Sequence, residues 1–209
     1  YNLGITFEEL RRVDEAVASY AQAITLKPAF AEAYYNLGIA ITNIRFNKSN
    51  RRLYPILLRL LTTGNFVSPG AIVGFILNLL KHDPLINKFL LEKNFANSLT
   101  DLTTIIASLN KLPLLHHLMR ICMLPDLQFE RLFVILRRYI IMNLDTVDES
   151  PELIHFLSTL SLHCFVNEYI YLESDEETRL IEDLQAKVAQ TLALSKQPEA
   201  IKILCLASY

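Results

Sequence analysis

The chain has 209 residues, of which 52% are hydrophobic and 20% are charged, and its net charge is -2. This composition excludes an intrinsically disordered protein, which needs low hydrophobicity and high net charge, and it argues against a strongly basic nucleic-acid-binding protein. The length suffices for one large domain or two small ones.

The composition also predicts the fold class. The chain holds 38 leucines against 8 valines, and leucine keeps its rotamer freedom in a helix whereas valine does not. All five glycines lie at or before Gly74, so the rest of the chain offers no glycine-rich loop for a phosphate or dinucleotide. Three cysteines without paired spacing favour a reduced, cytoplasmic setting. We predict an all-α protein with no catalytic, metal or cofactor site of its own.

A repeat opens the chain. The sequence Tyr-Asn-Leu-Gly-Ile at residues 1–5 recurs at residues 35–39, and the offset of 34 residues is the period of the tetratricopeptide repeat (TPR). Small and aromatic residues continue that pattern through the first unit. The residues that we predict to pack the repeat are Leu3, Gly4, Phe7, Ala16, Tyr20, Ala23, Pro28, Tyr34, Leu37 and Gly38. Residues 1–45 thus resemble the TPR family over one repeat and the first helix of another.

The pattern has a physical basis. Gly4 and Gly38 allow two helices to approach closely, because glycine has no Cβ. Ala16 and Tyr20 belong to an apolar stripe with i, i+4, i+7 spacing, which predicts the contact face of a second helix. Pro28 ends that helix, since proline cannot continue it. A single repeat cannot bury both of its faces, so we expect either further repeats before Tyr1 or cover from the helices that follow.

Residues 46–209 are predicted to form an irregular α-helical domain of roughly seven to nine helices, because the 34-residue period does not persist. Residues 60–80 carry no charge, but a Ser-Pro pair interrupts them, so two buried helices are favoured over a membrane span. Ser68, Ser150 and Ser174 are typical residues for the starts of three further helices.

Two short segments of this domain carry a second resemblance. Residues 79–85 and 161–171, the latter with the acids at 173–177, are similar to the helical region between TPR repeats and a class I S-adenosylmethionine-dependent methyltransferase domain in a group of bacterial proteins. The resemblance covers roughly residues 50–209. That resemblance implies a non-catalytic interaction or regulatory module, with S-adenosylmethionine bound by a domain beyond Tyr209. The alternative is a stand-alone TPR adaptor. An enzyme within the helical domain is disfavoured, because no glycine loop, metal-ligand spacing or nucleophile arrangement is present.

The predicted partner is a protein or peptide held in the TPR groove. Asn2 and Asn36 lie one repeat apart, and in TPR superhelices asparagines at this position line the concave groove, where their amides can contact a peptide backbone. The alternative is that both are ordinary exposed residues. Tyr35 and Ile39 stand where the charged clamp of some TPR proteins has Lys and Asn, so no such clamp is expected. The predicted peptide-binding residues are Asn2, Tyr35, Asn36 and Ile39.

Charge is unevenly distributed after the repeat. Residues 145–183 contain eleven acids and one base, which we interpret mainly as solvated helix faces and turns. The pair Arg137 and Arg138 is interpreted as a solvated helix edge. A basic patch at the end of the repeat could bind phosphate, RNA or an acidic partner, and nucleic acid is the weaker of these interpretations. The patch comprises Arg45, Lys48, Arg51, Arg52 and Arg59.

The histidines and cysteines do not predict chemistry. His163 and Cys164 are adjacent and so point to different faces of a helix, and Cys164 is best interpreted as a small buried hydrophobe. Glu168 lies nearby in the sequence, but the three residues do not have the spacing of a metal-binding motif. His116 and its neighbour His117 lack a partner at metal-ligand spacing, and we expect one to be buried and one exposed. The acids at 173–177 occupy a helix start, where the helix dipole explains them.

Overall fold

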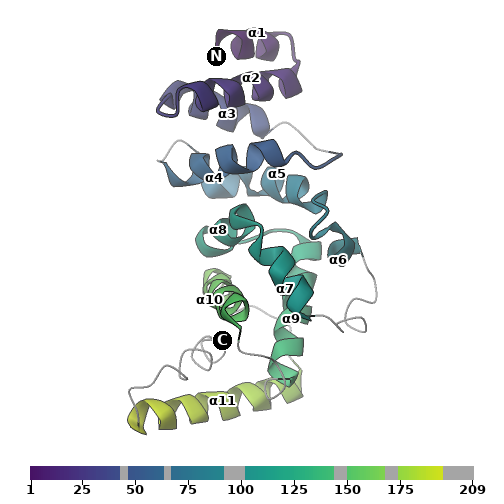
Figure 1. The fold of residues 1–209 in the computed structure, drawn as a ribbon, viewed down its shortest axis with the longest axis vertical. Coiled ribbons are helices and arrows are strands. Elements are labelled where there is room, and N and C mark those ends of the chain that lie inside the picture. Colours follow the sequence, from purple (N-terminus) through teal and green to yellow (C-terminus); the bar gives the residue numbers. More distant parts are fainter. Residues whose placement is uncertain (43–46, 64–66, 92–101, 144–149, 168–173, 195–209) are drawn as a thin grey trace. The chain divides into compact units, whose positions relative to one another are not determined.

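The structure is a computed structural model, and it describes residues 1–42, 47–63, 67–91, 102–143, 150–167 and 174–194 (Figure 1). These residues form eleven α-helices and one 3-10 helix, with no strand in the described ranges, so the all-α prediction is confirmed. In chain order the helices are α1 (Asn2–Glu9), α2 (Val13–Leu26), α3 (Ala31–Ile41), η1 (Arg51–Leu53), α4 (Tyr54–Thr62), α5 (Pro69–Lys81), α6 (Asn87–Leu91), α7 (Leu102–Asn110), α8 (Pro113–Ile121), α9 (Leu127–Met142), α10 (Pro151–Val166) and α11 (Asp175–Leu194).

The chain divides into two compact units. The first comprises Tyr1–Asn87 with Pro113–Leu118, and the second comprises Lys88–Leu112 with Met119–Tyr209. The boundary predicted at residue 45 follows the end of the repeat similarity, and it does not coincide with this division. A domain boundary at that position therefore stays a prediction.

In the first unit, the main partner of α1 is α2, whereas α3 packs against both α2 and α5. This difference explains a departure from the predicted packing residues. Leu37 in α3 is fully buried, but Leu3, one repeat earlier in α1, is 60% exposed. The prediction that Leu3 packs the repeat is wrong for the described residues, because α1 has no helix on the side where α3 meets a neighbour.

The other predicted packing residues mostly lie in the core. Phe7 is half-buried beneath the Arg12 guanidinium, which lies 4.7 Å from the centre of the ring. Pro28 is exposed, but α2 ends at Leu26 just before it, in keeping with its predicted role as a helix terminator. The buried members are Gly4, Ala16, Tyr20, Ala23, Tyr34, Leu37 and Gly38.

Gly4 sits directly against the ring of Tyr20. A Cβ at Gly4 would lie 2.6 Å from Cε1 and 2.8 Å from Cδ1 of that ring. Tyr20 is fully buried, and its hydroxyl donates a hydrogen bond of 2.6 Å to the Glu8 carboxylate, which fixes the far end of the ring. The close approach of α1 and α2 therefore depends on the missing side chain at Gly4.

Replacing Gly4 with alanine should lower the free energy of unfolding by about 1–2 kcal/mol, because overpacking against Tyr20 outweighs the better helix propensity of alanine. Gly74 supplies the matched control, since nothing lies within 4 Å of a Cβ built there. Gly74→Ala should raise stability by roughly 0.5–1 kcal/mol. Urea unfolding curves of both variants measure the difference, and a Gly4→Ala variant at least as stable as the wild type would contradict the close packing.

In the second unit, α9 packs against α11 and α7 against α10. The helix starts follow from short sequence signals. The Ser150 hydroxyl accepts a hydrogen bond of 3.1 Å from the Leu153 N–H, and Ser174 and Glu177 form the predicted capping box. In the first unit, Ser68 precedes Pro69 at the predicted start of α5, although its side chain makes no capping hydrogen bond.

The uncharged stretch at residues 60–80 is divided as predicted. Helix α4 ends at Thr62 and α5 begins at Pro69. None of the helices searched in the described ranges is both long and apolar enough to cross a membrane. From α4 onward these ranges hold eight α-helices, within the predicted seven to nine.

Candidate peptide-binding site

The predicted peptide-binding residues lie on α1 and α3, the two helices that pack on α2 in the first unit. Tyr35 is 55% exposed and Ile39 is 46% exposed. Their i, i+4 spacing places the two side chains on one side of α3. Asn2 is exposed at the start of α1. An apolar strip of Tyr35 and Ile39 is therefore open to solvent on α3.

Asn36 has a different environment from Asn2. Its side chain is half-buried, and its Nδ2 donates a hydrogen bond of 3.3 Å to the Tyr1 hydroxyl. The ring of Tyr1 stacks at a tilt on Phe30, with 4.7 Å between centroids. The Asn36 side chain also hydrogen-bonds Tyr20 of α2. The amide of Asn36 thus links the beginning of α1, α2 and α3.

Gly38, the glycine of the second repeat signature, packs against a different residue from Gly4. A Cβ at Gly38 would collide with Cγ2 of Val67, which precedes α5. The sequence predicted close helix approach at Gly38, and the structure shows that the residue before α5 occupies the space that Tyr20 fills at Gly4. The repeat pattern thus ends with α3, and Val67 covers the glycine.

The basic patch is partly neutralised by an acid. Arg51 donates from Nε (2.9 Å) and Nη2 (2.6 Å) to the fully buried carboxylate of Asp83. The Tyr54 hydroxyl (2.8 Å) and the Leu85 N–H (2.9 Å) donate to the same carboxylate. Burial by itself would raise the pKa of Asp83, but these hydrogen bonds outweigh it and hold the pKa below its usual value. Arg45 of the predicted patch lies outside the described residues.

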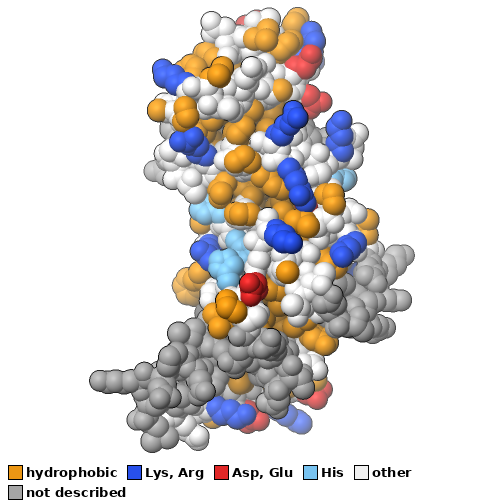
Figure 2. All heavy atoms as spheres, viewed as in Figure 1, with side chains coloured by type: hydrophobic (Ala, Val, Ile, Leu, Met, Phe, Trp, Pro, Cys, Tyr) orange, Lys and Arg blue, Asp and Glu red, His pale blue; other side chains and the backbone are white. Residues whose placement is uncertain are grey.

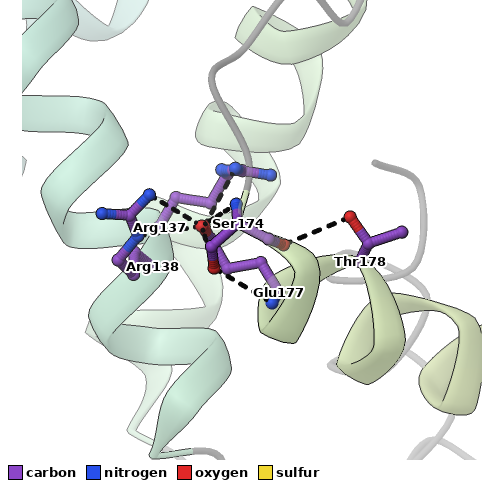
Figure 3. Close-up of polar contacts among 5 residues, drawn as sticks. All are labelled: Arg137, Arg138, Ser174, Glu177 and Thr178. Carbon is purple, nitrogen blue, oxygen red and sulfur yellow. Dashed lines mark hydrogen bonds and ion pairs between the residues drawn. The ribbon is translucent and has the colours of Figure 1, made fainter.

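The acidic end of α11 is also paired internally (Figure 3). The fully buried Glu177 accepts from Arg137 Nη2 at 3.1 Å and from Arg138 Nε at 2.8 Å. Arg137 is only 1% exposed, so its interpretation as part of a solvated helix edge is wrong. The reason is that α11 packs against α9 and supplies a carboxylate at that point, as well as the capping box with Ser174.

His163 and Cys164 are both buried in α10. Burial lowers the pKa of His163 to about 4, against a smaller opposite effect from the Met119 backbone. Its Nε2 lies 3.2 Å from Nδ2 of Asn167, and Phe133 meets the ring edge-on. A cavity of about 240 Å³ lies beside it. Glu168 lies outside the described residues.

The remaining candidates give no reactive arrangement in the described ranges. His116 is buried and His117 is half-buried, rather than one buried and one exposed. Burial raises the pKa of the Cys122 thiol to about 11, so that thiol is protonated and weakly nucleophilic at neutral pH. Among the described residues, no group of three His, Cys, Asp or Glu side chains could hold a metal ion.

A comparison with protein-family models matched residues 9–42 to the TPR repeat family. Residues 9–42 are therefore similar to a TPR repeat. The match spans α2 and α3 with the turn between them, which is one period of the pattern. TPR repeats are non-catalytic and generally bind protein or peptide partners. Comparisons with curated proteins and with solved structures gave no match.

Two buried charge pairs, one at Asp83 and one at Glu177, were not predicted from the sequence. Asp83 is the only acid between residues 33 and 91, and this isolation in a basic stretch was a signal that it could be paired. No such sequence signal pointed to the pair of Glu177 and Arg137. The two residues are 40 positions apart, and the burial of Arg137 depends on helix packing. The TPR repeat itself was identified from its period.

Proposed function

We propose that this chain is a protein-interaction module that holds an extended peptide or a helix of a partner protein on the exposed side of α1 and α3. The observation that carries the proposal is the open strip of Tyr35 and Ile39 on a helix of the TPR repeat. Tyrosine offers a large, rigid contact surface with a hydroxyl at its end, and such residues often dominate binding energy.

Polar side chains beside the strip complement this contact. The amide of Asn2 is exposed and can both donate to and accept from a peptide backbone. Asn36 is half-buried and is held by hydrogen bonds to Tyr1 and Tyr20, so Asn2 is the more accessible of the two amides. Backbone contacts give affinity with little demand on the partner's sequence, so selection would rest on the side chains that meet Tyr35 and Ile39.

We further propose, on the resemblance of residues 79–85 and 161–171, that the chain is the non-catalytic part of a bacterial TPR-containing S-adenosylmethionine-dependent methyltransferase in the cytoplasm. The residues of this chain do not fit the methyl donor, because the last glycine is Gly74 and no glycine-rich loop follows. A separate domain would bind it. The coding sequence on both sides tests this proposal: a glycine-rich cofactor motif downstream supports it, and a stop codon soon after Tyr209 leaves the stand-alone adaptor.

Selection of displayed random peptides against the full chain tests the binding function. Peptides that bind should lose about tenfold or more in affinity to the Tyr35→Ala/Ile39→Ala double variant, because aromatic and aliphatic anchors typically contribute more than 1 kcal/mol each. Fluorescence anisotropy measures the dissociation constants.

Two variants on α2 serve as controls, since Leu26 and Gln22 are also exposed. Leu26→Ala is the control for truncating an exposed apolar side chain, as in the double variant. Gln22→Ala is the control for an Asn2→Ala variant, which truncates an exposed amide side chain. Both controls should bind as the wild type does. Selected peptides that bind the double variant as tightly as the wild type would place the binding site elsewhere.

A further inference from the structure

One stretch of the first unit has a single sign of exposed charge. Between residues 33 and 87 the sequence contains six bases and one acid, Asp83. Because Asp83 is fully buried, every exposed formal charge among the described residues of this stretch is positive. Figure 2 shows Lys and Arg side chains over the region of α3 to α5, with exposed hydrophobic side chains between them.

Asp83 binds one of these bases, Arg51, through two hydrogen bonds. By accepting from Arg51 and Tyr54, it fixes η1 and the start of α4 to the turn that follows α5. Lys48 and Arg52 lie within three positions of Arg51 in the chain, and Lys81 lies two positions before Asp83. We call these four bases the basic cluster; it comprises Lys48, Arg51, Arg52 and Lys81.

The basic cluster keeps capacity for another anion. The side chain of Arg51 is 53% exposed, and only two of its three nitrogens donate to Asp83. Lys48 and Arg52 are exposed. Four bases lie within three positions of Arg51 or Asp83 in the chain and only one acid does, so the formal charge of the basic cluster is positive.

The basic cluster lies close along the chain to the apolar strip of the proposed binding site. Both belong to the first compact unit. Lys48 lies six positions after Thr42, the residue that follows the last turn of α3, so their Cα atoms are at most about 21 Å apart. An extended peptide of about ten residues is long enough to contact Tyr35 or Ile39 and the basic cluster together.

We propose that the partner of this module is an acidic, extended protein segment, with apolar side chains that meet Tyr35 and Ile39 and with Asp or Glu side chains that meet the basic cluster. This inference rests on the proposed binding function. Protein is favoured over nucleic acid, because a chain with a pI near 6.2 lacks the overall basic character of nucleic-acid-binding domains. Exposed charge complementarity of this kind mainly increases the association rate and the specificity, and salt weakens it.

The test uses the full chain and three fluorescent twelve-residue peptides that share the same leucine and tyrosine positions. The other positions are Glu and Asp in the first peptide, Gln and Asn in the second, and Lys in the third. We expect the acidic peptide to bind at least about tenfold more tightly than the neutral one at low salt, and the difference to shrink as salt is added. A Lys48→Glu/Arg52→Glu variant should remove this preference, whereas Arg131→Glu, an exposed site in the second unit, should preserve it.

A preference for acidic peptides and peptide binding as such can be distinguished by these measurements. Equal binding of the acidic and neutral peptides, or preference for the basic one, overturns the acidic partner but leaves peptide binding in place. Acidic preference that survives Lys48→Glu/Arg52→Glu overturns the assigned surface. If none of the three peptides binds, the inference fails, and the unbiased peptide selection decides the binding function independently. Tighter binding of a single-stranded RNA of equal charge than of the acidic peptide overturns the choice of a protein partner.

Discussion

Replacing Glu177 with glutamine should lower the free energy of unfolding by about 3 kcal/mol, because removal of one partner from a buried ion pair leaves the other charge uncompensated. Arg138 is half-exposed and can turn to water, but Arg137 is buried and cannot. Glutamine still accepts from the Ser174 N–H, so the capping box is retained and the charge is the main change. Urea unfolding measures the effect, and hydrogen exchange of α11 locates it.

The control is Glu176→Gln, an exposed acid in the same helical turn, which should change stability by less than about 0.5 kcal/mol. A double variant distinguishes lost charge balance from lost packing. Combining Glu177→Gln with Arg137→Met removes the unpaired charge and should recover part of the stability, as a double-mutant cycle would show. If Glu177→Gln is as stable as the wild type, the pair with Arg137 does not stabilise the second unit.

Acidification should destabilise the second unit through His163. Burial lowers the pKa of this side chain to about 4, from an ordinary value of 6.5. Between these values the unfolded chain binds a proton that the folded chain does not, so stability falls as the pH falls through this window. The full difference is about 3 kcal/mol, present above pH 6.5 and lost by about pH 4.

The measurement compares the pH dependence of unfolding for the wild type and for His163→Asn. Asp83 and Glu177 have lowered pKa values and also lose stability in acid, so the slope that disappears in the variant is the contribution of His163. His155→Asn, at an exposed position of the same helix, should keep the wild-type slope. An unchanged slope in His163→Asn would show that this histidine does not remain neutral in the fold.

The residues proposed to bind an acidic partner and the residues whose substitution should lower stability belong to different compact units. The basic cluster and the Tyr35–Ile39 strip lie in the first compact unit, and Glu177 and His163 lie in the second. Variants of the second unit should therefore leave the charge preference for peptides unchanged under conditions in which they remain folded. Any loss of peptide preference in Arg131→Glu would instead indicate a general effect of net charge.

The sequence by itself determined the helical class, the repeat and several helix starts. These features depend on local signals: leucine content, a 34-residue period, and serines such as Ser150 and Ser174 that cap the backbone within three residues. Gly4 was predictable for the same reason, since its role within the repeat is fixed by its spacing from Tyr20.

Only the tertiary structure decided which exposed-looking residues are buried and which repeat positions are left open. Arg137 and Asp83 are charged residues that sequence rules place on the surface, and each is buried because a distant helix or turn supplies its partner. Leu3 and Leu37 share one repeat position, yet only Leu37 has neighbouring helices on both sides. Burial is a property of the whole packing arrangement, so local periodicity could not distinguish them.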